Sequence, residues 1–335
     1  MKLSSKVKTF ILMIALAFAV LSCKNSVDEA SPSENKENTK PTPAPEIPDF
    51  TEVPLTLEFT AEGTITISNP WSTLRYEKDG ELITVETNDT LTIPVTKDEK
   101  ISFYAEKSEN NANTYMSMNC NSDCYVYGNI MSLVTFDDVS SNWNHSATSL
   151  TTQNCFRGLF SKNRHINIHN DKPLVLPATT LTKSCYSYMF YWCSSLTSAP
   201  VLPATSLAEY CYDSMFYGCT SLTSAPKLPA TSLKNGCYFG MFICCSSLTS
   251  APDLLAATLV PSCYYLMFYS CKKLNYIKCL ATDISEGGST IDWIDGVASE
   301  GTFVKAADTN WSVKTGKNGI PEGWTVKNAS EETEA

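Results

Sequence analysis

The amino-acid sequence predicts an α/β solenoid of 26-residue repeats, with a strand and a short helix in each, preceded by a small all-β sandwich-like domain. A fixed period in this range is typical of stacked units that bury their apolar faces against one another. Alternation of apolar and polar residues before the repeats indicates the β domain. The repeats are marked by two cysteine series with a step of 26 residues, here called the ladder cysteines: Cys185, Cys211, Cys237 and Cys263, and Cys193, Cys219, Cys245 and Cys271.

The middle of each repeat predicts a helix of about two to three turns. In one repeat, Leu207, Cys211, Met215 and Cys219 lie four residues apart, a spacing that would place their side chains along one side of a short helix. Ser206 stands where a helix N-cap belongs. The Leu-Pro-Ala-Thr and Leu-Thr-Ser-Ala-Pro segments between these stretches are short and bounded by prolines, so they predict brief strands.

The motif Phe-x-x-Cys-x-x-Leu occurs four times, beginning at Phe190, Phe216, Phe242 and Phe268. This motif resembles the BspA-like leucine-rich repeats of bacterial surface proteins. The resemblance implies a leucine-rich-repeat solenoid over residues 145–280 and a cell-surface location. The period of 26 residues is longer than the commonest one in that family, and the array is short. The repeat consensus of the family carries no ligand specificity.

Residues 1–22 are interpreted as a lipoprotein signal peptide. A lysine-containing start precedes an uncharged run from Thr9 to Leu21, which is short for a membrane span. The residues that follow resemble a lipobox, in which Cys23 would carry the lipid and begin the mature chain; an ordinary signal peptide with an incidental cysteine is the alternative. Residues 23–50 are polar and rich in proline, and they predict a disordered linker. We therefore expect a lipid-anchored protein of the bacterial outer membrane or cell surface.

Two further segments flank the repeats. Residues 51–135 contain short alternating runs, with the hairpin signal Asp79-Gly80 between two of them, and predict a small β sandwich. After the repeats, residues 281–327 contain apolar and aromatic residues that predict a cap over the last repeat. Residues 328–335 are acidic and predict a disordered tail.

Composition and motifs exclude several function classes. The formal net charge is −10, and removal of residues 1–22, with three lysines and no acidic residue, brings it to −13. An acidic chain of this kind disfavours nucleic acid as a partner. The sequence has no nucleophile elbow, phosphate-binding glycine loop or zinc-ligand spacing, and its histidines, His145, His165 and His169, fit solvated positions better than metal ligation. We expect a protein without enzymatic activity, cofactor or metal.

Fourteen cysteines in an exported chain raise the question of disulfide bonds. The ladder cysteines hold core-like positions, which favours buried thiols, although the spacing of stacked strands permits bridges between neighbouring repeats. Cys120 and Cys124 differ, because they lie outside the repeats in a polar segment. Both a local disulfide and a pair of thiols fit these two residues.

Three columns of residues are candidate ligand-binding positions. The tyrosine after the first cysteine of each repeat either packs between turns or forms an exposed aromatic strip: Tyr186, Tyr212, Tyr238 and Tyr264. A second set of tyrosines follows the Met-Phe pair: Tyr191, Tyr217 and Tyr269. Another column varies between repeats while its neighbours do not, which indicates exposure to solvent: Val201, Lys227 and Asp253. We expect protein binding and adhesion to host or neighbouring cells, with glycan binding in nutrient capture as the alternative.

Overall fold

The computed structural model describes residues 50–86, 89–106, 115–137, 140–284, 288–307, 311 and 315–334. The chain divides into two units, Met1–Glu46 and Ile47–Ala335, and all described residues belong to the second. The predicted signal peptide, the lipidation site Cys23 and the linker up to residue 49 lie outside the described residues.

The N-terminal part of the second unit is built from short strands and one 3-10 helix, η2 (Ile130–Leu133). The strands are β1 (Leu55–Phe59), β2 (Gly63–Ser68), β3 (Arg75–Lys78), β4 (Glu81–Thr84), β5 (Leu91–Val95), β6 (Lys100–Tyr104), β7 (Ser117–Cys120) and β8 (Cys124–Asn129). A hairpin of β9 (Phe136–Asp137) and β10 (Asn142–Trp143) follows. Two strands of the first repeats, β11 (Ile166–Ile168) and β12 (Leu174–Val175), join β8 in parallel.

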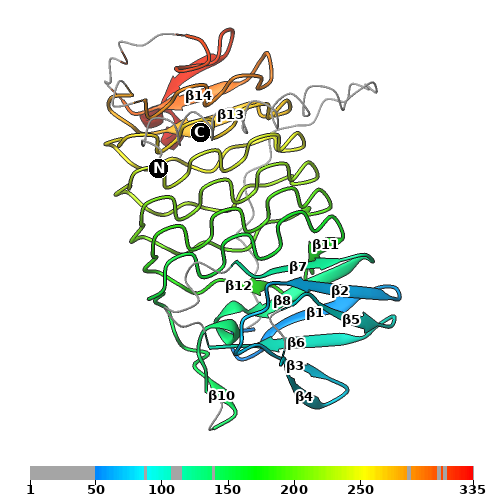
Figure 1. The fold of residues 1–335 in the computed structure, drawn as a ribbon. Coiled ribbons are helices and arrows are strands. Elements are labelled where there is room, and N and C mark those ends of the chain that lie inside the picture. The colour runs from blue at the N-terminus through cyan, green and yellow to red at the C-terminus, as the bar shows by residue number, and fades with distance from the viewer. Residues whose placement is uncertain are drawn as a thin grey trace, which may run out of the picture. The chain divides into compact units, whose positions relative to one another are not determined.

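These strands form two sheets with a shared apolar core (Figure 1). The larger sheet has the order β11-β8-β1-β6-β3-β4, and the smaller has the order β5-β2-β7. Alternate residues of β1 and β2, including Leu57, Phe59 and Ile65, are almost fully buried, as expected for strands with one face in a core. Asp79 and Gly80 both adopt positive φ in the turn between β3 and β4, the backbone that a two-residue hairpin turn requires.

The repeats contain no α-helix, so the prediction of an α/β leucine-rich-repeat solenoid with one helix per repeat is wrong. Throughout the described residues, the helical segments are the short 3-10 helices η2 and η3 (Ala329–Glu334). The middle of each repeat is a continuous series of turns. The backbone of each 26-residue repeat goes once around the stack, and one such turn is here called a coil. Figure 1 shows the coils as successive similar loops of backbone.

A left-handed residue at every fourth position prevents helix formation. The φ angles at these positions lie between 53° and 73°, whereas an α-helix requires a continuous run of negative φ. In three coils they are Ser184, Tyr188 and Trp192; Tyr210, Ser214 and Gly218; and Gly236, Gly240 and Cys244. The stripe of apolar residues four apart therefore comes from a repeated four-residue turn and not from the 3.6-residue period of a helix.

Backbone hydrogen bonds alternate along each series of turns. The N–H of Met189 bonds to the carbonyl of Tyr186 three residues earlier, at 3.3 Å, and closes a local turn. The N–H of the next residue, Phe190, instead donates to the carbonyl of Met215 in the following coil, at 2.9 Å. Alternate amides thus close turns and link coils, which satisfies the backbone without a helix.

Both ends of the stack of coils are paired with strands. At one end, Ile166 of β11 is in register with Cys124 of β8. At the other end, β13 (Tyr276–Cys279), β14 (Thr302–Lys305) and β15 (Thr325–Asn328) form a parallel sheet. The predicted cap contains one more turn series, since the N–H of Tyr264 donates to the carbonyl of Ser289 at 2.9 Å. Within residues 328–335, the predicted tail, the structure has η3.

Candidate functional site

The first tyrosine column lies inside the stack. Tyr186, Tyr212, Tyr238 and Tyr264 are each only 1–2 % exposed. Their rings stack face to face between coils, with centroids 5.7–6.2 Å apart, and the column begins with Phe156. Of the two interpretations of this column, the structure has the packing between turns, and the exposed aromatic strip that would bind a ligand is not formed because the rings are buried between the coils.

A second stack of rings runs beside the first. It consists of Phe160, Phe190, Phe216, Phe242 and Phe268, with centroids 5.5–5.7 Å apart and ring planes within 22° of parallel. Trp293 is fully buried and packs against both Tyr264 and Phe268 at the end of the two columns. Stacked rings of this kind add to the hydrophobic free energy of burial, so the interior of the stack is a structural core.

The ladder cysteines are buried thiols. In the second series each thiol donates a hydrogen bond to a phenylalanine carbonyl of the preceding coil: Cys193 to Phe160, Cys219 to Phe190, Cys245 to Phe216 and Cys271 to Phe242, at 3.0–3.1 Å. Burial raises the pKa of the ladder thiols, to about 11 at Cys263 and about 12 at Cys211. Thiolate chemistry is therefore suppressed at these positions.

The column that varies between repeats is on the surface. Val201, Lys227 and Asp253 are all exposed, Val201 to 54 %. Each follows a buried proline, so the backbone beside it is firmly held while the side chain faces solvent. An apolar, a basic and an acidic side chain in one column give a surface of mixed character rather than a charged strip.

A group of aromatic residues on the turns of the first two full coils is partly exposed. This aromatic flank consists of the half-buried Tyr188, Tyr191, Trp192 and Arg157, together with Tyr217, which is only 2 % exposed and packs against the other rings. The ring of Tyr191 lies 4.8 Å from that of Tyr217 in the next coil and 5.5 Å from that of Tyr188. The ring of Trp192 lies 5.9 Å from Tyr217 and covers Gly218, where a Cβ would lie 2.8 Å from the indole.

Arg157 connects this flank to the N-terminal part of the unit. Its guanidinium carbon lies 4.7 Å from the ring centroid of Tyr188 and 5.3 Å from that of Tyr115, which is 43 % exposed. A cation between two rings in this way is attracted by both. The flank is thus a rigid surface of aromatic rings with one positive charge at its edge.

Sequence analysis included Tyr191 and Tyr217 in the second set of tyrosines, but it missed Tyr188 and Trp192, because the residues at these two positions differ between repeats. Tyr188 aligns with Ser214, Gly240 and Leu266, and Trp192 aligns with Gly218. The variation that singled out Val201, Lys227 and Asp253 applies equally to these positions, so the signal was present.

No family model, no curated protein and no solved structure matches this chain. Among the described residues, no three side chains of His, Cys, Asp and Glu lie close enough together to hold a metal ion. The same part of the chain has no helix with the length and apolar character needed to cross a membrane.

One buried carboxyl group lies beneath the flank. Asp213 is 8 % exposed and accepts a hydrogen bond from the Ser214 hydroxyl at 2.7 Å, and its backbone carbonyl accepts from the N–H of Tyr188. Burial raises the pKa of Asp213 to about 6, against the lowering effects of the Ser214 hydrogen bond and the positive charge of Arg157. The charge beneath the flank thus depends on pH near 6.

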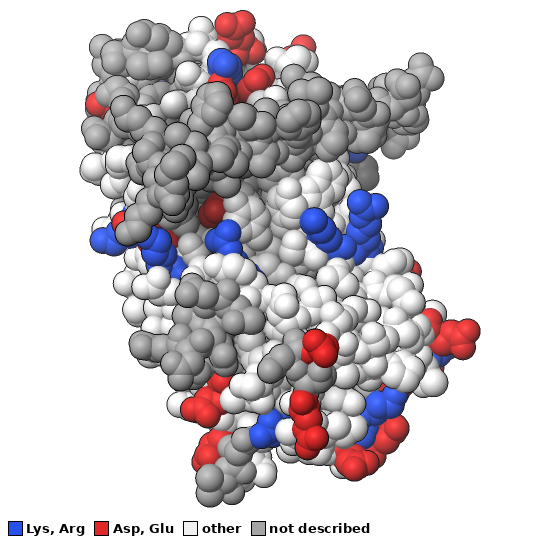
Figure 2. All heavy atoms as spheres, viewed as in Figure 1, with Lys and Arg blue, Asp and Glu red and all other residues white. Residues whose placement is uncertain are grey.

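The charged side chains are unevenly distributed over the surface. On the face that Figure 2 shows, acidic side chains gather over the strands of the N-terminal part, and several Lys and Arg side chains lie across the middle of the molecule, with uncharged surface between the two groups.

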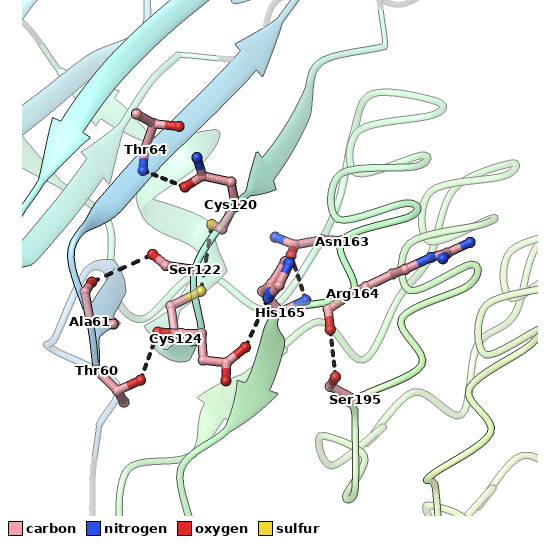
Figure 3. Close-up of polar contacts among 12 residues, drawn as sticks. Thr60, Ala61, Thr64, Cys120, Ser122, Cys124, Asn163, Arg164, His165 and Ser195 are labelled. Atoms are coloured by element: carbon pink, nitrogen blue, oxygen red, sulfur yellow. Dashed lines mark hydrogen bonds and ion pairs between the residues drawn. The ribbon is translucent and has the colours of Figure 1, made fainter.

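Cys120 and Cys124 lie where the two sheets meet the first coil (Figure 3). Both are thiols, and their sulfur atoms are 3.5 Å apart. A hydrogen bond from the Cys124 thiol lowers the pKa of Cys120, and the same bond raises the pKa of Cys124. On the adjoining coil, Asn163 donates from its side chain to the carbonyl of Met118 at 3.3 Å, and His165 pairs with Asp123 at 2.8 Å.

Proposed function

We propose that this chain is a non-enzymatic surface lipoprotein, anchored through Cys23, whose coils bind a protein on host or neighbouring cells. Support for the anchor comes from the uncharged run before Cys23 and its lipobox-like sequence. Support for the surface location comes from the resemblance of the repeat motif to BspA-like surface proteins.

The observation that carries the binding role is the aromatic flank. Tyrosine, tryptophan and arginine are the residues that most often dominate the binding energy at protein interfaces. Apart from the buried Tyr217, the flank side chains are partly exposed, yet each ring is held by a neighbour 4.7–5.9 Å away, as in the contact of Arg157 with Tyr188 and of Trp192 with Tyr217. Side chains that are already ordered lose little conformational entropy on binding.

A glycan is the second candidate ligand. Partly exposed rings such as Trp192 and Tyr191 offer faces on which a sugar ring can stack, while the buried tyrosine column offers none. Protein is favoured because the flank rings lie tilted or edge-on to one another, with angles of 40–81° between their planes, and so form an uneven surface rather than one flat platform.

Cell binding distinguishes the two ligand classes. The mature chain with Cys23→Ser, which lacks the proposed lipidation site, is labelled and incubated with host epithelial cells and with other bacteria. Target cells are treated beforehand with protease or with mild periodate, which oxidises sugars. We expect saturable binding that protease treatment removes and periodate leaves intact.

The opposite pattern, with loss after periodate and retention after protease, would establish the glycan-binding alternative. An absence of saturable binding to every cell type would contradict both. The same protein unfolded in urea and diluted onto the cells is the control for non-specific adhesion of aromatic residues.

A further inference from the structure

We propose that Cys120 and Cys124 are a redox site, oxidised to a disulfide that joins β7 to β8 beside the first coil. The two sulfur atoms already lie 3.5 Å apart. A disulfide requires about 2.05 Å, so the atoms need to approach by roughly 1.5 Å, which side-chain rotation can supply. Figure 3 shows the two thiols directed toward one another from neighbouring strands.

Strand pairing on several sides holds the two residues in this position. Cys120 is in register with Ile65 of β2, and Cys124 is in register with Phe59 of β1 and Ile166 of β11. The N–H of Cys124 also donates to the carbonyl of His165 at 3.0 Å. The approach of the sulfur atoms is thus built into two sheets and does not depend on a loose loop.

The ladder cysteines provide the contrast. Cys193, Cys219, Cys245 and Cys271 are 0 % exposed and direct their thiols at backbone carbonyls. Cys120 is 8 % exposed and Cys124 is 2 % exposed, so Cys120 is the thiol that an external reagent meets first. The hydrogen bond from Cys124 also lowers the pKa of Cys120, which favours its nucleophilic thiolate.

Because Cys120 is the more exposed thiol and has the lowered pKa, it reacts first in the proposed oxidation. The oxidant is the disulfide of a thiol oxidoreductase or of a small molecule. The Cys120 thiolate attacks one sulfur of the oxidant, forms a mixed disulfide and releases the other sulfur as a thiolate. Cys124 then attacks the Cys120 sulfur and releases the second thiolate. Two thiol protons leave with the released sulfurs, and the oxidant gains two electrons.

The new bond would connect two sheets that meet the repeats. Cys120 belongs to the β5-β2-β7 sheet, whereas Cys124 begins the strand that pairs with β11 of the first coil. Oxidation should therefore stabilise the boundary between the N-terminal sheets and the coils. This role is independent of the ligand, so it can fail without affecting the proposed binding function.

Differential thiol labelling tests the proposal on the mature chain with Cys23→Ser. The folded, reduced protein is treated with oxidised glutathione, acid-quenched, unfolded and alkylated; it is then reduced, alkylated with a heavier reagent and analysed by peptide mass spectrometry. We expect the heavy label on Cys120 and Cys124 and the light label on the ladder cysteines. Light label on both Cys120 and Cys124, under conditions that oxidise dithiothreitol, would overturn the proposal.

Single variants test the order of the steps. Cys124→Ser should accumulate glutathione on Cys120, whereas Cys120→Ser should leave Cys124 unmodified; the reverse pattern would overturn the assignment of Cys120 as the attacking thiol. Cys193 is a buried thiol that lies near Cys124, so Cys193→Ala is the matched control and should retain the bond. Heavy label on Cys193 paired with either residue would also contradict the proposal.

Discussion

The Cys219 thiol donates a hydrogen bond to the backbone carbonyl of Phe190, 3.1 Å away in the preceding coil. Both residues are fully buried, and the same contact recurs between Cys245 and Phe216. The second cysteine series thus links each coil to the preceding one through a thiol-to-carbonyl hydrogen bond, which needs no second cysteine. This relationship explains how the thiols of the second series find hydrogen-bond acceptors without disulfide bonds.

Cys219→Ala should lower the free energy of unfolding by about 1–3 kcal/mol, because it removes a buried sulfur and its hydrogen bond. The measurement is the urea midpoint of the mature chain with Cys23→Ser. Lys227→Ala on the exposed column is the control and should change the free energy by less than about 0.5 kcal/mol. Equal midpoints for Cys219→Ala and the control would show that the contact contributes nothing.

Gly236→Ala should destabilise the protein by about 1–3 kcal/mol, since its φ is +59° and its Cβ would lie 2.3 Å from the Tyr210 ring. The equivalent position of the next coil is Ser262, with φ of 57°. Ser262→Gly should leave stability unchanged or raise it by up to about 1 kcal/mol. Thermal unfolding of both variants gives the comparison, and destabilisation by Ser262→Gly would contradict the left-handed turn.

Asp213→Asn should stabilise the protein above pH 6. The raised pKa of Asp213 means that folding favours the protonated carboxyl. The contribution of this carboxyl to the free energy of unfolding is fully present below about pH 4, the ordinary aspartate pKa, and is lost as pH rises to about 6. A shift of about two units corresponds to about 3 kcal/mol. The stability difference from the natural protein should grow between pH 4 and 6 and then level off. A difference independent of pH would show that Asp213 is ionised without cost.

Cys23→Ser should move the protein from the membrane fraction to the soluble fraction of the cells that produce it. Lipidation at Cys23 is the sole anchor proposed here, and a chain without acyl groups has no comparable affinity for a bilayer. Fractionation and incorporation of labelled fatty acid are the measurements. Retention of fatty acid by the variant would contradict the assignment of Cys23.

The period and its inward-facing positions could be predicted from the sequence, but the backbone between them could not. Residues that recur unchanged, such as Met215 and Phe216, are fully buried, because stacked identical coils place equal residues in one column. The helix was predicted from a stripe at Leu207, Cys211 and Met215. On a helix with 3.6 residues per turn, side chains that are repeatedly four residues apart move progressively around the helix axis and leave the buried face. The strict spacing of four residues therefore indicates repeated four-residue turns.

The flank could not be predicted as a group because it joins residues from different coils. The contact of Arg157 with Tyr188 depends on the stacking of one coil on the next, which the sequence of a single repeat does not contain. Likewise, the inward direction of the Tyr186 side chain depends on whether the backbone around it forms a helix or a series of turns with left-handed residues. Its recurrence in every repeat was nevertheless the correct signal for a core position.

The most direct test of recognition by the aromatic flank is the cell affinity of Trp192→Ala compared with that of Tyr186→Phe. The Tyr186 hydroxyl is buried and finds no hydrogen-bond partner among the described residues, so its removal should leave both folding and binding intact. Both variants are measured as folded protein, with equal urea midpoints as the criterion for comparison, and Lys272→Ala serves as an exposed control on a later coil. We predict at least a tenfold loss of affinity, about 1.4 kcal/mol, for Trp192→Ala alone. If the Trp192→Ala variant is fully folded and binds the cells with unchanged affinity, recognition by the flank is contradicted.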